Sequence, residues 1–433
     1  MNKLVLRFSK STIVKFLFFL LMITTVFMYG LDIQLPQILL IIIACSIVLI
    51  GNETELLAMV LCCIPLYICF EYMYIVLVAS IVLLFKNIRK YKVNISVVIL
   101  LTLLMWELLH GLDGDFALNS FVVMILPYAF VFLLQFYNGR KVDYKYLVSV
   151  FAICVISLGI MFIIETIIDS GGNVTYALSN INRLGLKSDT EVTWGVINPN
   201  SLGIICVLAI SGVIQKMLYL GQNKLDVPLV VALLIIGFLT LSRTFIICLF
   251  IAVSLFTFGK KRTFKENLKI IGIFLIIVLI CTIVFSAVFP GVYESFASRW
   301  QEADMSNGRL EIFEQSFNYI ISNPSVLIWG IGQQNFAENA RNLVEMPPHD
   351  AITELVMAWG IVGLALFVGY ILSMIISAKK KNPNIMLANY IPLIIIIVKG
   401  FAGHLITSGY TMIALIFAYL SLEANFNDAY KDY

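Results

Sequence analysis

Charged residues are scarce in this chain. Asp, Glu, Lys and Arg make up 13% of its 433 residues and hydrophobic residues make up 61%, whereas soluble domains carry about a quarter charged residues. No aqueous core could bury that much apolar surface, so the composition excludes a soluble globular domain. Lipid offers the backbone no hydrogen-bonding partners, which favours helices. We therefore expect an all-α, polytopic integral membrane protein.

Cysteine and histidine are sparse in the polar segments. All eight cysteines fall inside apolar runs and none in a loop, so neither a disulfide framework nor a zinc site is expected. Of three histidines, His349 alone lies in a long polar loop, while His110 ends an apolar run and His404 lies in a tight apolar hairpin. We expect packing roles for the latter two. Neither a P-loop nor a dinucleotide fingerprint appears, and no nucleic-acid partner is expected.

Apolar runs are abundant. A spanning helix needs about 20 apolar residues, and fourteen candidate spans begin near residues 13, 35, 56, 72, 95, 119, 146, 199, 227, 244, 269, 351, 385 and 406. The third and fourth are short and meet at Glu71, so they are two spans, one long tilted helix or a re-entrant pair. We expect 12 to 14 transmembrane helices in a single membrane domain, residues 1–433.

The basic residues predict the orientation. With the N-terminus inside, the fourteen-span map places four basic segments on the cytoplasmic side, together with both termini. These segments are Lys86 to Lys92, Arg140 to Lys145, Lys260 to Lys269 and Lys379 to Lys381.

Seven of the 29 basic residues remain outside, and five of them are arginine. The seven are Arg183, Lys187, Arg243, Arg299, Arg309, Arg341 and Lys399. Guanidinium groups suit phosphate oxygens better than ammonium groups do. The bias therefore favours an anionic substrate at the outer face, with chance in a small sample as the alternative.

Two outer segments are long enough to hold a site, residues 169–196 and the extracytoplasmic loop 290–350. Within the second, apolar residues recur at helical spacing after Asn307, a candidate N-cap, and Asn323-Pro324 ends the run. We predict an amphipathic helix there, lying on the outer membrane interface.

Two groups of outer residues are candidates for binding an anion. Arg183 comes shortly before Asn198-Pro199-Asn200, which opens a helix whose positive end favours anions; the alternative is a plain turn and cap. Ser242-Arg243-Thr244 lies between two apolar runs, where an arginine is costly and should be paired. The alternative there is an arginine that snorkels at a hairpin.

A third group could supply a base. Asn307-Gly308-Arg309 is followed by Gly330-Ile331-Gly332, and Pro347-Pro348-His349-Asp350 then leads into a span. His349 could accept a proton from a hydroxyl, with Asp350 or Glu354 orienting it; otherwise it is an ordinary loop histidine. Asp113-Gly114-Asp115 has the spacing of a two-carboxylate metal motif, but a solvated turn explains it as well and no third ligand is evident.

Taken in order, these motifs resemble the O-antigen polymerase and ligase family, and above all its Wzy-type polymerases. The resemblance covers roughly residues 180 to 370, from Arg183 through Ser242-Arg243-Thr244, Gly308-Arg309 and Gly330-Ile331-Gly332 to His349 and Gly360-Ile361-Val362-Gly363. One departure is Asp350, because the family's histidine is commonly followed by asparagine.

The resemblance implies a membrane glycosyltransferase of the GT-C type in the inner membrane of a bacterium. It would join polyprenyl-diphosphate-linked repeat units into capsule, O-antigen or exopolysaccharide, with flippase and chain-length proteins as partners. Arg183 and Arg243, with Arg309 less certain, would hold the diphosphate, and His349 would be the base. A diphosphate leaves readily, so neither a metal nor another cofactor is expected.

Three other functions stay open. A ligase would move finished polymer onto another acceptor, and the sequence does not separate acceptors. A peptidoglycan polymerase of the shape, elongation and division class would need a residue pattern that is not seen. A carrier or flippase would show ionisable residues at mid-span, for which Glu107, Glu165 and Lys399 are candidates, although they lie near the ends of spans.

Overall fold

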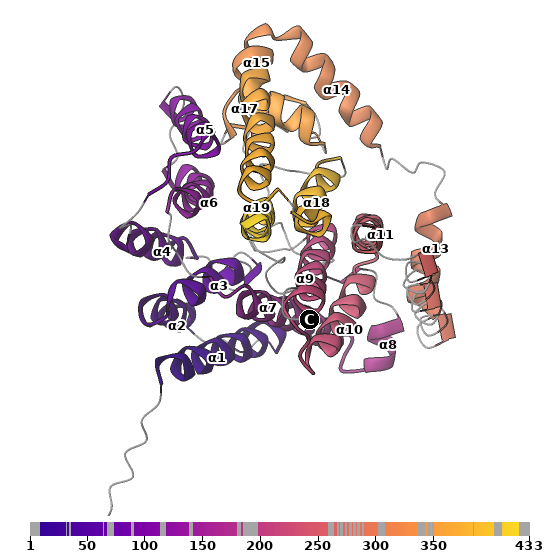
Figure 1. Cartoon of the computed structure of the whole chain (residues 1–433). Coiled ribbons are helices and arrows are strands. Elements are labelled where there is room, and N and C mark those ends of the chain that lie inside the picture. Colours follow the sequence, from indigo (N-terminus) through magenta and orange to yellow (C-terminus); the bar gives the residue numbers. More distant parts are fainter. Residues whose placement is uncertain are drawn as a thin grey trace, which may run out of the picture.

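The computed structural model of the chain is all-helical over the residues that it describes (Figure 1). These are residues 9–31, 33, 36–63, 65–66, 73–87, 91–112, 118–137, 142–179, 183–184, 198–258, 290–301, 308–333, 335–336, 343–344, 348, 350–383, 385–401 and 409–423, with scattered residues between 264 and 287.

The helices follow the predicted apolar runs. Every run coincides with a helix except the one beginning near residue 269, most of which lies outside the described residues. The first seven helices are α1 (Lys10–Gly30), α2 (Gln37–Ile50), α3 (Glu53–Cys63), α4 (Met73–Asn87), α5 (Ile95–Leu112), α6 (Leu118–Phe136) and α7 (Tyr144–Asp169). The others are α8 (Val174–Ser179), α9 (Pro199–Tyr219), α10 (Asp226–Leu239), α11 (Arg243–Phe258), α13 (Pro290–Gln301), α14 (Arg309–Ser322), α15 (Pro324–Trp329), α17 (Ala351–Lys381), the 3-10 turn η2 (Leu387–Tyr390), α18 (Ile391–Gly400) and α19 (Gly409–Glu423).

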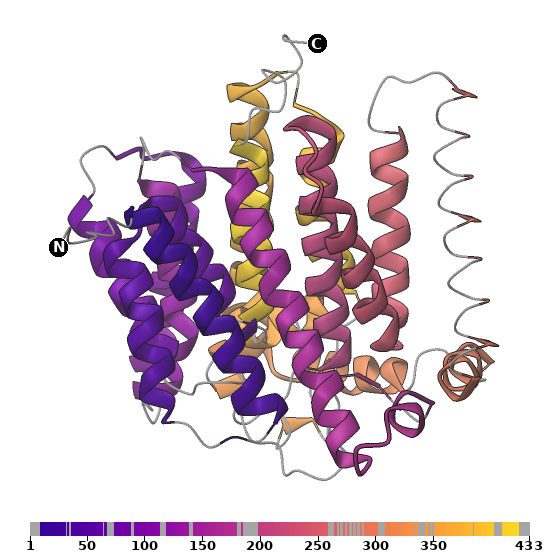
Figure 2. The same ribbon diagram turned by 90° about the horizontal axis from the view of Figure 1, so that it is seen from below.

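Length and composition support a multi-pass membrane protein. Four of the described helices, α1, α7, α9 and α17, are long and apolar enough to cross a bilayer, and further apolar helices are shorter. Helices α3 and α4 are separate and pack against each other, which does not fit one long tilted helix. The number of spans otherwise stays a prediction. Figure 2 shows most of the helices running side by side.

Polar contacts gather several helix ends on one face. Tyr144, at the start of α7, donates to the Gln215 side chain near the end of α9 (2.5 Å). Gln215 donates in turn to the Ala388 carbonyl (2.7 Å) and to Ser421 near the end of α19 (3.1 Å). The start of α7 and the ends of α9 and α19 therefore lie on the same face, as the predicted topology requires. Which side of the membrane this face occupies stays a prediction.

The N-terminal helices add to the same face. Tyr137 donates to Glu53 at the start of α3 (2.7 Å), and the Asp143 amide, directly before α7, donates to Thr54 (2.9 Å). Lys92 lies on the segment that pairs with Phe136 (2.8 Å). The basic segments near residues 92 and 145 thus share the face predicted to be cytoplasmic.

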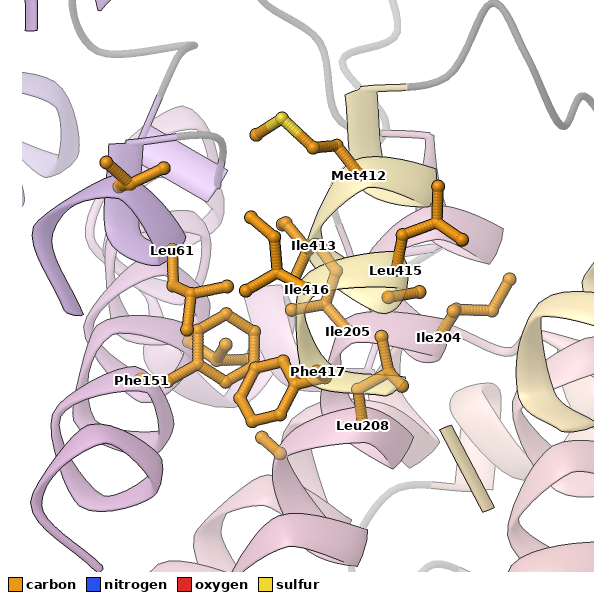
Figure 3. Packing of buried hydrophobic residues seen from close by; sticks show 14 of the residues in the cluster. Leu61, Phe151, Ile204, Ile205, Leu208, Met412, Ile413, Leu415, Ile416 and Phe417 are labelled. Atoms are coloured by element: carbon orange, nitrogen blue, oxygen red, sulfur yellow. The ribbon is translucent and has the colours of Figure 1, made fainter. Parts of the chain in front are cut away.

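The core is built from large apolar side chains between long helices. Residues of α3, α7, α9 and α19 interdigitate there (Figure 3). The rings of Phe151 on α7 and Phe417 on α19 lie 4.7 Å apart and both side chains are fully buried. The six cysteines that the structure describes are free, five of them buried, as expected for packing residues.

The predicted amphipathic helix is present as α14. Gly308, with a φ of 74°, rather than Asn307, precedes its first residue. One face buries Ile312, Ser316 and Ile320, and the opposite side exposes four large apolar residues: Leu310, Phe313, Phe317 and Ile321. The helix packs against α15 and α17, as its place beside them in Figure 1 shows. Its exposed stripe suits a membrane interface.

A buried ion pair joins α9 to α10. Lys216 and Asp226 are 2.7 Å apart and almost fully buried. Lys216 also donates to Ser149 on α7 (2.8 Å), and the Asn223 amide donates to Asp226 (2.8 Å). Because both charges are away from water, each depends on the other.

We expect Lys216→Met to lower the free energy of unfolding by about 3–5 kcal/mol, because it leaves Asp226 charged and buried. Denaturant unfolding of the purified protein in detergent would measure this. The double variant Lys216→Met/Asp226→Leu should recover much of the loss. Lys381→Ala, which breaks the exposed pair of Lys381 with Glu423, should cost about 0–1 kcal/mol. Equal losses in Lys216→Met and Lys381→Ala would contradict this account.

We expect the exposed stripe of α14 to contact lipid. Tryptophan placed at Phe313, on the stripe, should be quenched by lipids brominated near the headgroup. Tryptophan placed at Glu311, which is exposed and lies farther round the helix from the stripe, should be quenched much less. The parent protein corrects for native tryptophans. Equal quenching at both positions would mean that the stripe does not face the membrane.

Candidate functional site

Arg183 lies where α9 begins and α10 ends, a place at which three chain segments meet. Its Nη2 donates to the Asn200 side-chain oxygen (2.9 Å), and its Nε lies 3.4 Å from the Thr240 carbonyl. The next residue is fixed as well, because the Leu184 amide donates to the Leu239 carbonyl (3.0 Å). The half-buried guanidinium is therefore held at the end of α10.

The start of α9 supports this arrangement. Asn198 is the N-cap and its side chain accepts from the Asn200 amide (2.9 Å), with Pro199 as the first helical residue. This is the cap that the sequence predicted. The first amides of a helix carry a partial positive charge, so Arg183 and the helix end place positive potential in one location.

The α10–α11 turn brings Arg243 to the same location. Ser242 donates to the side-chain oxygen of Asn200 (2.9 Å), the atom that also accepts from Arg183. Arg243 follows as the first residue of α11 and is half-buried. Arg183 and Arg243 are thus connected through Asn200 and Ser242. We call Arg183, Asn200, Thr240, Ser242 and Arg243 the arginine junction.

The turn itself is strained. Leu241 has a φ of 49°, the left-handed region that residues with a side chain avoid. The Ser242 hydroxyl accepts from the Phe245 amide (3.2 Å) and so caps α11. Behind the turn, the Phe245 ring fills the space over Gly237, where any Cβ would overlap it. Close packing of α10 on α11 therefore fixes Arg243, and strained backbone of this kind gathers at functional sites.

The first part of α17, from Ala351 to Trp359, is a separate helical segment, which we call the outer segment after its predicted side of the membrane. The helix is interrupted at Gly360, whose φ of 69° and ψ of −177° are not helical. The freed backbone pairs with the segment after α15: the Ile331 amide donates to Met357 (2.9 Å) and the Gly332 amide to Ala358 (2.8 Å). Backbone groups inside a membrane need such partners. We call this pairing the helix break.

Asp350 begins this outer segment. Its carboxylate accepts from the amides of Ile352 (3.0 Å) and Thr353 (2.9 Å), and the Thr353 hydroxyl donates to it as well. Asp350 is therefore the N-cap of α17, a role that the sequence analysis missed although an aspartate before an apolar run is a typical cap signal. Its part in orienting His349 stays a prediction.

Glu354, the other candidate to orient His349, has a fully buried side chain. It interacts electrostatically with Lys399 on α18. Lys399 lies in the last turn of α18, as expected, and donates to Thr411 on α19 (3.2 Å). The part of Glu354 in orienting His349 stays a prediction.

Several predicted site residues lie outside the described residues. These are His349, the side chain of Arg309, the Asp113-Gly114-Asp115 segment and His404. Their proposed roles stay predictions. In the part of the chain that the structure describes, no group of three or more His, Cys, Asp and Glu residues is placed to hold a metal ion.

The apolar helices define the chain as a multi-pass membrane protein, and the arginine junction lies at one end of its helix bundle. Residues 228–368 match the family model of the O-antigen ligase. This segment, about a third of the chain, belongs to that family, and the resemblance read from the motifs is confirmed. Membership implies a polymerase or ligase enzyme acting on lipid-linked sugars. No curated protein matches the chain significantly.

The matched segment contains only part of the candidate site. Arg243, Arg309, His349 and Asp350 fall inside it, whereas Arg183 does not. Arg183 nevertheless contacts Thr240, which lies inside. The arginine junction is therefore completed by two residues upstream of the matched segment, Arg183 and Asn200.

We expect Gly360→Ala to disrupt the helix break. A Cβ there would overlap the Ile328 carbonyl, and the positive φ adds about 1–3 kcal/mol of strain. Gly369→Ala on the same helix is the control, because its Cβ would meet only Ile99 at an ordinary 3.8 Å. Thermal unfolding in detergent should show a clear loss for Gly360→Ala alone. Equal stability of the two variants would contradict the interruption at Gly360.

Proposed function

We propose that the protein is a polysaccharide polymerase. It joins polyprenyl-diphosphate-linked oligosaccharide repeat units at the outer face of the bacterial cytoplasmic membrane. The observation that carries the proposal is the arginine junction, where the Arg183 guanidinium and the positive end of α9 meet the turn that carries Arg243. Such a combination binds anions with several oxygens, and a diphosphate is the anionic group of a lipid-linked sugar.

The reaction follows from these roles. His349 takes a proton from a sugar hydroxyl of one lipid-linked repeat, and the hydroxyl oxygen attacks the anomeric carbon of the growing chain. The bond from that carbon to the diphosphate oxygen breaks, and the diphosphate leaves with the electron pair. Arg183 and Arg243 stabilise the negative charge on it, as fixed cationic groups do most effectively where water is excluded. Asp350 directly follows His349 and caps α17, so it fixes the point in the chain at which His349 is attached.

The location suits an amphiphilic substrate. The arginine junction lies at the ends of α9, α10 and α11, opposite the face that gathers Gln215 and Ser421. The polyprenyl chain could therefore remain in lipid while the sugars extend into water. Both termini would lie in the cytoplasm. Flippase and chain-length proteins would supply substrate and limit the product.

We expect Arg243→Ala and His349→Ala each to lower polymer formation by about 10²–10³-fold, the usual loss when a group stabilising the transition state is removed. Cells that lack the native protein would be supplied with each variant at matched membrane levels. Polymer and lipid-linked repeats would then be assayed. Single repeats should accumulate on the outer leaflet.

The control and the other outcomes are distinct. Lys145→Ala, an exposed cation on the opposite face, should leave polymer unchanged. Polymer that persists in both variants would overturn the assigned roles. Repeats trapped on the inner leaflet would indicate a flippase, and loss of polymer transfer to a second acceptor with normal polymer length would indicate a ligase.

A further inference from the structure

The last two turns of α5 contact the helix break through hydrogen bonds and ring stacking. Trp106 donates from its indole nitrogen to the Trp359 carbonyl (3.1 Å), and its ring stacks on Trp329 with centroids 5.4 Å apart. One turn later, the Nε2 of His110 lies 2.8 Å from the Trp329 carbonyl. Helix α5 therefore contacts both chain segments that meet at the helix break.

Glu107 lies at the centre of these contacts. Its side chain is buried, with 4% of its surface exposed. Both carboxylate oxygens accept from the Gln333 amide (3.1 and 2.9 Å), and Oε2 also accepts from the indole nitrogen of Trp359 (2.6 Å). A carboxylate inside a membrane helix is costly and usually functional. Here it bridges the segment after α15 and the residue directly before Gly360.

This bridge holds Trp359, the last residue of the outer segment of α17, against α5. Residues Ala351 to Trp359 form about two and a half turns, roughly 13 Å of helix, whose far end carries Asp350 and follows His349. A tilt at Trp359 would therefore displace His349. Glu107 and Glu354 also both interact with Tyr128 on α6, so α5, α6 and α17 meet around the same point.

We propose that Glu107 is a positioning residue for His349. It fixes the outer segment of α17 at its inner end and so sets the distance between the base and the diphosphate bound at the arginine junction. This inference rests on the proposed function. It also assigns a role in the reaction to α5, which lies outside the segment that matches the O-antigen ligase model.

The carboxylate is specifically required by its donors. In Glu107→Gln the amide keeps the volume of the side chain, but its NH₂ group would face the Gln333 amide in either orientation, because that donor contacts both carboxylate oxygens. With the NH₂ group in place of Oε2, the contact with the Trp359 indole would be lost as well. A displacement of about 1 Å at a reacting group can lower the rate by about a hundredfold.

The first test separates rate from binding. Purified parent protein, Glu107→Gln and Trp359→Phe would be assayed on a polyprenyl-diphosphate-linked repeat. We expect kcat to fall ten- to a hundredfold in both variants with KM changed less than about threefold. The kcat of the double variant should be no lower than that of the poorer single variant, because both substitutions disturb the same group of hydrogen bonds around Glu107. Met105→Ala, on the exposed side of α5, should match the parent.

Two results of this assay would overturn the proposal. The first is an unchanged kcat in Glu107→Gln at matched stability. The second is a raised KM with an unchanged kcat, which would mean that Glu107 contacts the substrate instead of positioning the helix. Trp359→Phe removes the indole donor together with part of the buried ring, so the thermal stability of both variants is compared before their rates are interpreted.

The second test does not depend on the reaction. Val356, buried on the outer segment of α17, is replaced by cysteine and labelled with a membrane-impermeant maleimide, with the parent correcting for native cysteines. We expect labelling at least tenfold faster when Glu107→Gln is added and no change when Met105→Ala is added. Unchanged labelling in Glu107→Gln would refute positioning. If labelling is faster in Glu107→Gln but the parent protein makes no polymer, the polymerase proposal is refuted, while the positioning of the outer segment of α17 by Glu107 stands.

Discussion

A hydrocarbon bilayer supplies no water to bond with a polypeptide backbone, and the candidate site is arranged around the places where this chain stops being helical. At the helix break, Gly360 leaves the helical conformation, and the amides of Ile331 and Gly332 bond to the carbonyls that are set free. At the α10–α11 turn, the Ser242 side chain accepts from the Phe245 amide at the start of α11. The helix break is therefore completed by a second chain segment, and the turn by a side chain of its own.

Several buried polar side chains connect segments that are far apart in the chain. On the face predicted to be cytoplasmic, Tyr144, Gln215 and Ser421 connect the ends of α7, α9 and α19. At the other end of the bundle, Glu107 accepts from the Gln333 amide and the Trp359 indole, and Asn200 accepts from Arg183 and Ser242. Gln215, Glu107 and Asn200 thus each bond to two other segments and help to fix their relative position.

The fold could be predicted further than the site. Apolar run length is a local property, so helix positions and the alternation of basic segments were visible in the sequence. The α9 cap and α14 were visible for the same reason. The arginine junction was not, because Arg183 with Asn200 and Ser242 with Arg243 were recognised as two separate motifs and only tertiary packing joins them. The role of Glu107 was hidden more deeply, since its partners Gln333 and Trp359 are 226 and 252 residues away. The one local signal was an acidic residue in an apolar run.

The shared side-chain oxygen of Asn200 has a consequence for how the junction would respond to charge. It accepts from Arg183 and from Ser242 at 2.9 Å each, and a neutral amide oxygen is a weaker acceptor than a phosphate oxygen. An incoming diphosphate would therefore draw the guanidinium away from the amide, and the hydroxyl next to Arg243 would become the only one of these two donors left on that oxygen. Binding of an anion at Arg183 would thus change the hydrogen bonding of Ser242, the residue directly before Arg243.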